Sequence, residues 1–210
     1  MHEKPTGDRG PITLAGTKIR WEKIEQPKTK EALEQFYFDI FLIALKNTGI
    51  RNIQGKQNEE NNFDFTLSIN AENTYIDMAE LVIAEGKGSP YKGQPPRYEF
   101  SRYTDAVRKV IEKKNAKYQA RSSAPIQLLF YSTHWGFTIA PPIIDLMRYE
   151  IQSLPHRFNA IYYLQPLGEN EGVLYMLYPA KRSISEKDYE TMKANIAIPL
   201  DPKAWKTAKE

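Results

Sequence analysis

FDFTLSINAENTYIDMAELVI, residues 63–83, is the stretch that decides the fold. Two runs rich in aromatic and β-branched residues, at about 63–69 and 74–84, flank a short polar segment, and this pattern predicts two strands joined by a hairpin turn. Each run carries one acid, Asp64 in the first and Asp77 in the second. An ionised carboxylate is costly to bury unless it is paired or binds a metal. We therefore expect a hairpin that brings both acids to one end of a sheet, where they suit a divalent cation.

The composition is that of a soluble globular protein, with 41% hydrophobic and 26% charged residues, and 210 residues suffice for one domain with a sizeable core. We expect an N-terminal arm over 1–25, a single α/β domain over 26–198 and a flexible tail over 199–210. No run approaches the roughly 20 apolar residues that cross a bilayer, so we expect a cytoplasmic protein with no membrane partner. The absence of cysteine excludes disulfides and thiolate zinc sites.

Apolar spacing and turn signals predict the other elements. The predicted helices lie at about 30–47, 97–120 and 142–153, with a C-terminal helix that ends near 195 after a capping box at 183–186. The predicted strands lie at 126–131, 158–164 and 173–178, the last two forming a second hairpin. Residues 12–24 are a strand or an irregular arm, and 54–62 and 85–96 are loops. This order predicts an α/β fold with a mixed central sheet flanked by helices.

The two acids offer hard oxygen ligands. Two carboxylates on adjacent strands, with a nearby backbone carbonyl, suit Mg²⁺ or Mn²⁺. Because side chains alternate along a strand, Asp77 and Ala79 point to one face while Met78 and Glu80 point to the other. For either acid taken alone an ordinary structural role is the alternative, with Asp77 paired to a lysine and Asp64 at a turn or sheet edge.

One face of the long predicted helix is apolar except for a single lysine. That face comprises Phe100, Tyr103, Val107, Ile111, Lys114 and Tyr118. A lysine facing a sheet needs an acidic partner or a route to solvent, and the acids on the preceding strands are the obvious partners of Lys114. Lys113 and Lys117 are the alternatives if the helix is rotated, and a Lys114 that reaches solvent past the helix end is a third.

Basic residues are concentrated in the same region. Residues 86–122 carry ten basic and three acidic side chains, an excess that attracts a polyanion such as nucleic acid. The candidates for contacts with the nucleic-acid backbone are Lys87, Lys92, Arg97, Arg108 and Lys113. A solvated helix face is the alternative explanation of such a charge run.

The ordered set of these features resembles a known superfamily. A helix is followed by Phe63-Asp64-Phe65, a hairpin, the run from Tyr75 to Leu81, a helix that contains Lys-Lys-Asn-Ala-Lys-Tyr at 113–118, and a strand. Over about 30–132 this resembles the PD-(D/E)xK nuclease superfamily, in particular its stand-alone bacterial members of uncharacterised role. The resemblance implies a restriction-endonuclease-like core, to which this chain adds a C-terminal β-hairpin and helix.

The resemblance also implies roles for particular residues. Asp64 matches the acid of the first motif, although Phe63 replaces the usual proline, and Asp77 matches the acid of the second motif. Met78 lends its backbone carbonyl to the metal. Ala79 stands where active members carry a lysine that positions the attacking water.

Some members of the superfamily supply that lysine from the following helix, and Lys114 is the substitute here. Glu34, on the first helix, is a further candidate metal ligand, with an ordinary surface glutamate as the alternative. Glu80 and Lys117 are additional candidates for the site.

The resemblance implies Mg²⁺-dependent hydrolysis of phosphodiester bonds, in which Asp64 and Asp77 hold the metal and Lys114 assists. The alternative is a catalytically inactive nuclease-like fold that binds nucleic acid or protein, which the alanine at position 79 favours. The sequence leaves the choice of DNA or RNA and the oligomeric state open, a homodimer included.

Overall fold

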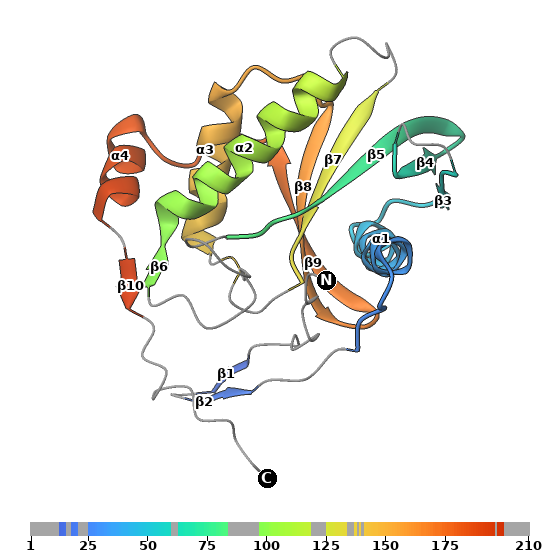
Figure 1. Ribbon diagram of the computed structural model, residues 1–210, viewed down its shortest axis with the longest axis horizontal. Coiled ribbons are helices and arrows are strands. Elements are labelled where there is room, and N and C mark those ends of the chain that lie inside the picture. Colours follow the sequence, from blue (N-terminus) through green and yellow to red (C-terminus); the bar gives the residue numbers. More distant parts are fainter. Residues whose placement is uncertain are drawn as a thin grey trace.

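The computed structural model describes residues 13–15, 18–20, 25–59, 63–83, 97–118, 125–133, 137, 139, 141–195 and 197–199 (Figure 1). For 13–15, 18–20, 97–98, 195 and 197–199 it describes the backbone alone. The whole loop expected at 85–96 therefore lies outside the described residues, together with Lys87 and Lys92, and so does the side chain of Arg97.

A six-stranded mixed sheet forms the centre of the fold. In spatial order its strands are β3 (Ile53–Gln57), β4 (Phe65–Ile69), β5 (Glu72–Glu80), β7 (Ile126–Tyr131), β8 (Ala160–Gly168) and β9 (Glu171–Tyr178). The three central strands, β5, β7 and β8, run parallel, and the outer strands pair antiparallel on both sides. The expected α/β fold with a mixed sheet flanked by helices is thus confirmed.

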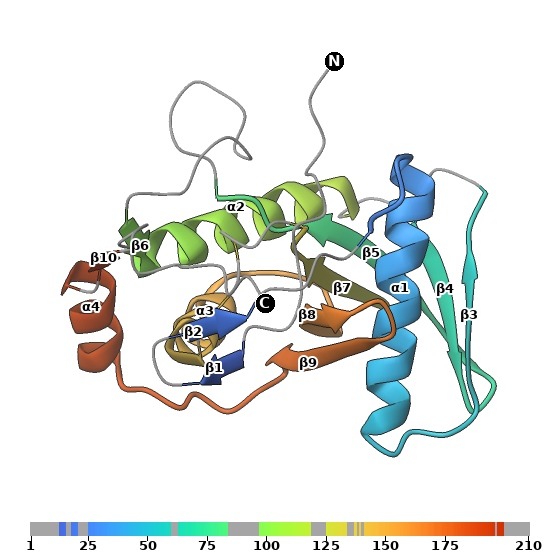
Figure 2. The same cartoon turned by 90° about the horizontal axis from the view of Figure 1, so that it is seen from below.

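The described part of the chain contains four helices, three of which flank the sheet (Figures 1 and 2). They are α1 (Lys30–Asn47), α2 (Phe100–Tyr118), α3 (Pro141–Ser153) and α4 (Glu186–Asn195). Figures 1 and 2 show α1 on one face of the sheet and α2 and α3 on the other, with α4 beside them. Two hydrophobic clusters follow this division, because α1 packs with Met78 and Leu129 whereas α2, α3 and α4 pack with Ala79 and Leu128. Alternate residues of β5 and β7 therefore face opposite layers, as strand geometry requires.

The first helix begins and ends where its sequence predicts. Thr29 is the N-cap, and its hydroxyl accepts a hydrogen bond from the backbone N–H of Ala32 at 3.2 Å. Glu31 in the first turn complements the helix dipole. After Asn47 the chain turns at Gly49, which has φ of 91°, a left-handed conformation that glycine adopts without strain.

The structure corrects the expected loop at 54–62. Most of β3 falls inside that range, and the strand pairs antiparallel with β4 along its whole length. Its sequence, Ile-Gln-Gly-Lys-Gln, lacks apolar alternation because it is an edge strand in which only Ile53 is buried. A strand with one buried side chain gives no periodic signal.

Other boundaries differ by a few residues. Strand β4 begins at Phe65, which leaves Asp64 in the bend before it. Helix α2 begins at Phe100 because the residues before it form β6 (Arg97–Glu99), which pairs with β10 (Ala197–Pro199). The expected C-terminal hairpin is present as β8 and β9, but these strands complete the central sheet rather than add to it.

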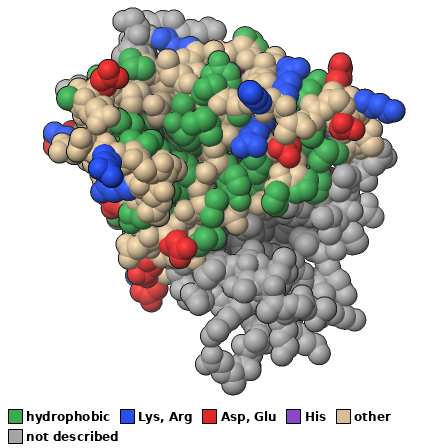
Figure 3. All heavy atoms as spheres, turned by 180° about the vertical axis from the view of Figure 1, so that it is seen from behind, with side chains coloured by type: hydrophobic (Ala, Val, Ile, Leu, Met, Phe, Trp, Pro, Cys, Tyr) green, Lys and Arg blue, Asp and Glu red, His purple; other side chains and the backbone are tan. Residues whose placement is uncertain are grey.

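The remaining features are peripheral. Strands β1 (Thr13–Ala15) and β2 (Lys18–Arg20) form an antiparallel pair. The face seen in Figure 3 carries hydrophobic side chains among scattered charged ones. Among the large hydrophobic side chains that the structure describes, Val173 and Met176 of the edge strand β9 are exposed. No helix within the described residues has the length and apolar character to cross a membrane.

Candidate functional site

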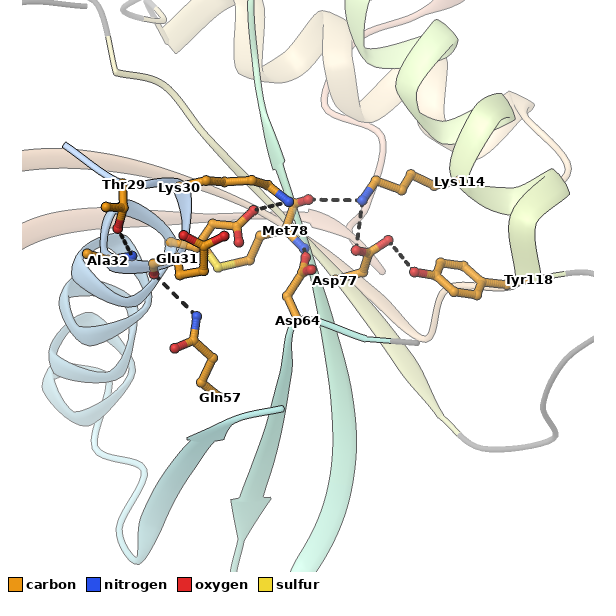
Figure 4. A network of polar contacts seen from close by, with 11 residues as sticks. Thr29, Lys30, Glu31, Ala32, Gln57, Asp64, Asp77, Met78, Lys114 and Tyr118 are labelled. Carbon is orange, nitrogen blue, oxygen red and sulfur yellow. Dashed lines mark hydrogen bonds and ion pairs between the residues drawn. The ribbon is translucent and has the colours of Figure 1, made fainter. Parts of the chain in front are cut away.

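Asp77 lies near the C-terminal end of β5 and is fully buried, with 0% of its surface exposed. Both of its carboxylate oxygens accept hydrogen bonds from α2. The ammonium of Lys114 donates to Oδ1 at 2.7 Å, and the hydroxyl of Tyr118 donates to Oδ2 at 2.8 Å (Figure 4). These two hydrogen bonds, one of them from a charged donor, offset the cost of burying the carboxylate.

Lys114 reaches the sheet as the helical spacing predicts. Its ammonium also donates to the backbone carbonyl of Met78 at 3.0 Å, and its side chain is 22% exposed. The expected contact with an acid of a preceding strand is therefore confirmed. The two alternative lysines are exposed, and Lys117 lies over the ring of Tyr118, 4.9 Å from the ring centroid.

Asp64 lies opposite Asp77 across the β4–β5 hairpin. Phe65 pairs with Ile76, so continuing this antiparallel register by one residue places the two acids side by side. Asp64 Oδ2 accepts a hydrogen bond of 2.6 Å from the backbone N–H of Met78. Met78 thus joins the site through its backbone alone, with its N–H on Asp64 and its carbonyl on Lys114.

The electrostatics of Asp64 follow from this crowding. Burial raises the pKa of Asp64 from its usual 3.8 to about 7, and the neighbouring Asp77 carboxyl adds to the rise by hydrogen bonding and repulsion. The Met78 N–H and the Lys114 charge act in the opposite direction but do not cancel the rise. Near pH 7 the site therefore favours either a proton or another cation between its two acids.

A second lysine approaches from the opposite layer. Lys30, in the first turn of α1, pairs with Glu34 at 3.4 Å, and Glu34 is only 8% exposed. The carboxylate of Glu34 raises the pKa of Lys30, and Asp64 makes a smaller contribution in the same direction. Figure 4 shows Lys30 and Lys114 directed towards Met78 from opposite sides.

Sequence reasoning did not find Lys30, although a signal exists. Glu34 lies on the apolar face of α1 between Leu33 and Tyr37, and a lysine four residues earlier is its natural partner. The alternative of an ordinary surface glutamate is wrong, because the side chain of Glu34 is buried. The structure does not bring it into direct contact with Asp77 in any described hydrogen bond, so its role as a metal ligand stays a prediction.

The oxygen donors of the site are of the kind that a magnesium ion binds. Asp64, Asp77 and the Met78 carbonyl are hard oxygen donors, and a dication between the carboxylates would relieve the repulsion that, in addition to burial, raises the pKa of Asp64. No three acidic or histidine side chains of the described residues are grouped as metal ligands. Mg²⁺ needs no such group, because it is usually held by one or two carboxylates and keeps several waters.

The other candidates lie elsewhere. Glu80 points to the face opposite Asp77, as alternation predicts, and it accepts a hydrogen bond from the hydroxyl of Thr133. Arg108 pairs with the buried Glu150 of α3, and its contact with nucleic acid stays a prediction. Lys113 is exposed, as a contact with nucleic acid requires.

Comparisons with known proteins leave the family unassigned. No protein-family model matches the chain, and no curated protein matches its sequence. Among solved structures the chain is similar to SfsA from Pyrococcus furiosus in complex with Ca²⁺, with 13% identity over 77% of this chain and 71% of that one. The TM-score is 0.29, too low to support a statement about fold or function. The resemblance to the PD-(D/E)xK superfamily therefore stays an expectation from sequence.

Proposed function

We propose that the protein is a Mg²⁺-dependent nuclease that hydrolyses phosphodiester bonds, with Asp64, Asp77 and Lys114 at its active site. The observation that carries this proposal is the convergence of these three side chains from separate elements: the bend before β4, strand β5 and helix α2. Two crowded carboxylates and one partly buried ammonium are unfavourable for stability alone and suit chemistry on a phosphate.

The metal would be held by Asp64, Asp77 and the Met78 carbonyl. Bound there, it would lower the pKa of a water molecule and offset charge on the phosphate. The protein's own groups supply the remaining functions. Tyr118 fixes the orientation of Asp77 through its hydroxyl, and the Met78 N–H holds one oxygen of Asp64.

Lys114 provides the positive charge that position 79 lacks. Ala79 lies on the same strand face as Asp77 and is buried against the layer that contains α2. A lysine there would have to extend from the strand, whereas Lys114 reaches the same acid from the helix at 2.7 Å. A fixed ammonium beside the reacting phosphate stabilises the charge that develops in the transition state.

The second candidate function is an inactive nuclease-like module that binds nucleic acid or protein. One specific observation favours it: the Lys114 ammonium already bonds to Asp77 Oδ1 and to the Met78 carbonyl, two of the three oxygens proposed for the metal. A chain in which this ammonium permanently replaces the metal would retain the fold and lose the reaction.

The test is cleavage of labelled single-stranded DNA, single-stranded RNA and plasmid DNA, with Mg²⁺ and with EDTA. We expect Mg²⁺-dependent cleavage that falls at least 100-fold in Asp64→Asn and in Lys114→Met, but stays normal in Lys187→Met, which removes an exposed lysine of α4. Salt-sensitive binding without cleavage would establish the inactive module instead. If the protein neither binds nor cleaves nucleic acid, the nuclease and the nucleic-acid-binding module are both refuted, and the protein-binding module is left.

A further inference from the structure

A cavity of about 330 Å³ lies between α2 and the end of β5. Its apolar wall is formed by Val82 and Ile83, which follow β5, and by Ala106 and Val110 on α2. The volume suits one small planar molecule, and the aliphatic side chains give such a molecule a surface to stack against. Neither the metal site nor the proposed reaction uses this cavity.

The polar lining of the cavity mixes both charges. Asp105 contributes a carboxylate and Lys109 a cation, whereas the carboxylate of Glu80 accepts from the Thr133 hydroxyl and Arg102 is paired with Glu99. One carboxylate and one cation are thus left for a ligand, so the lining has no net charge that would attract an anion. Carboxylates do accept hydrogen bonds from amino groups of nucleobases, such as N4 of cytosine. A neutral heterocycle with amino donors is therefore the ligand class that matches the cavity.

A row of lysines connects this cavity to the site. Lys109, Lys113 and Lys117 follow one another at four-residue spacing on α2, roughly 6 Å apart along the helix axis, and all three are exposed. Lys109 lines the cavity, and Lys117 lies over the ring of Tyr118, whose hydroxyl bonds to Asp77. Within the described part of the chain neither Lys109 nor Lys113 has an ion-pair partner.

We infer that the substrate is a single-stranded nucleic acid, with one unstacked base in the cavity and the adjoining phosphates along Lys109, Lys113 and Lys117. This inference rests on the proposed function and adds the substrate class to it. A duplex keeps its bases stacked and paired, and extracting one costs a few kcal/mol, so a duplex fills the cavity poorly. The lysine row instead suits the flexible backbone of a single strand, and stacking adds affinity at the base.

The test is binding without chemistry, measured by fluorescence anisotropy of fluorescein-labelled oligonucleotides in EDTA. The wild-type protein should bind oligo(dC) at least tenfold more tightly than a duplex of equal length. It should also bind oligo(dC) several-fold more tightly than oligo(dT), because thymine lacks an amino group. Equal affinity for single strand and duplex would overturn the inference.

Two sets of variants separate the base from the backbone. Changing Lys109, Lys113 and Lys117 to Gln should weaken binding at least tenfold and reduce the salt slope by about 2, because three phosphate contacts on a single strand contribute about 0.7 each. A charge-matched control changes three exposed lysines on other elements, Lys46, Lys181 and Lys187, and should leave binding unchanged. A control that weakens binding equally would show only a net-charge effect and would overturn the assignment.

Filling the cavity tests the base. Ala106→Trp should weaken oligo(dC) binding at least tenfold with an unchanged salt slope. Ala106→Leu is the milder second variant should the tryptophan impair folding, which thermal unfolding checks. Unchanged affinity in a folded cavity-filling variant would refute the base-binding role.

The outcomes also separate this inference from the proposed function. Single-strand binding that depends on the cavity, without cleavage in Mg²⁺, would retain the binding assignment and refute the nuclease. Cleavage that survives both the lysine and the cavity variants would retain the nuclease and refute the inference.

Discussion

Replacing Lys114 with Met removes the ammonium from the site and keeps most of its aliphatic stem. The fully buried Asp77 is then left with Tyr118 as its remaining donor in the described contacts. Removing one partner of a buried ion pair costs about 3–5 kcal/mol. Because the Lys114 side chain is 22% exposed and water can replace part of its contact, we expect the lower end, about 3 kcal/mol.

Urea denaturation measures this cost. With an m-value of about 2 kcal/mol/M, the midpoint should fall by roughly 1.5 M. The control Lys113→Met removes an exposed lysine from the same turn and should change stability by less than about 0.5 kcal/mol.

A double variant isolates the pair. Adding Asp77→Asn to Lys114→Met removes the unpaired charge as well, so at least half of the lost stability should return. A loss below about 1 kcal/mol in Lys114→Met, or no recovery in the double variant, would refute the view that Lys114 neutralises a buried charge.

Three further outcomes follow from the same contacts. The folded state holds the proton of Asp64 up to about pH 7, whereas the unfolded chain releases it near 3.8. The free energy of unfolding should therefore fall by up to about 4 kcal/mol as the pH rises from about 4 to 7. Urea titrations at each pH measure this fall, and Asp64→Asn should flatten it. Tyr118→Phe removes a hydrogen bond to the buried Asp77 carboxylate and should lower the free energy of unfolding by about 1.5–3 kcal/mol. Cleavage should fall as well. An unchanged urea midpoint would contradict the hydrogen bond. A Cβ at Gly55 would lie 2.3 Å from Cε1 of Phe38, so Gly55→Ala should cost about 1–3 kcal/mol, whereas Gly168→Ala, with no atom within 4 Å, should be nearly neutral in the same thermal scan.

The parts of the fold that sequence predicts are those with a periodic apolar signal. Helix α1 and the hairpin of β4 and β5 have such a signal because each buries one defined face. The contact of Lys114 with Asp77 was predictable for a related reason: a lysine on an apolar stripe must find a partner, and the hairpin supplies one.

The parts that sequence reasoning missed depend on tertiary contacts. Strand β3 has a polar sequence and forms because β4 offers it an unpaired edge. Strand β6 pairs with β10, about a hundred residues later, and no local pattern encodes that partner. Lys30 enters the site only because α1 packs on the face opposite α2, which spacing within one helix does not reveal.

The ion pair of Arg108 also depends on a tertiary contact that the local charge pattern does not predict. Its basic neighbours on α2 predict a contact with nucleic acid, but they do not predict its ion pair with the buried Glu150 of α3. Local charge density alone does not separate this paired arginine from the exposed Lys113. The ion pair depends on the packing of α2 against α3.

Calorimetric titration with Mn²⁺ tests the central claim, that Asp64 and Asp77 form one cation site, most directly. The wild-type protein should bind one Mn²⁺ with micromolar-to-millimolar affinity. Asp64→Asn, whose amide oxygen still accepts from the Met78 N–H, should abolish that binding, and the exposed control Asp39→Asn should not. A wild-type protein that binds no Mn²⁺, or an Asp64→Asn variant that binds it as well as the wild type, would contradict the cation site.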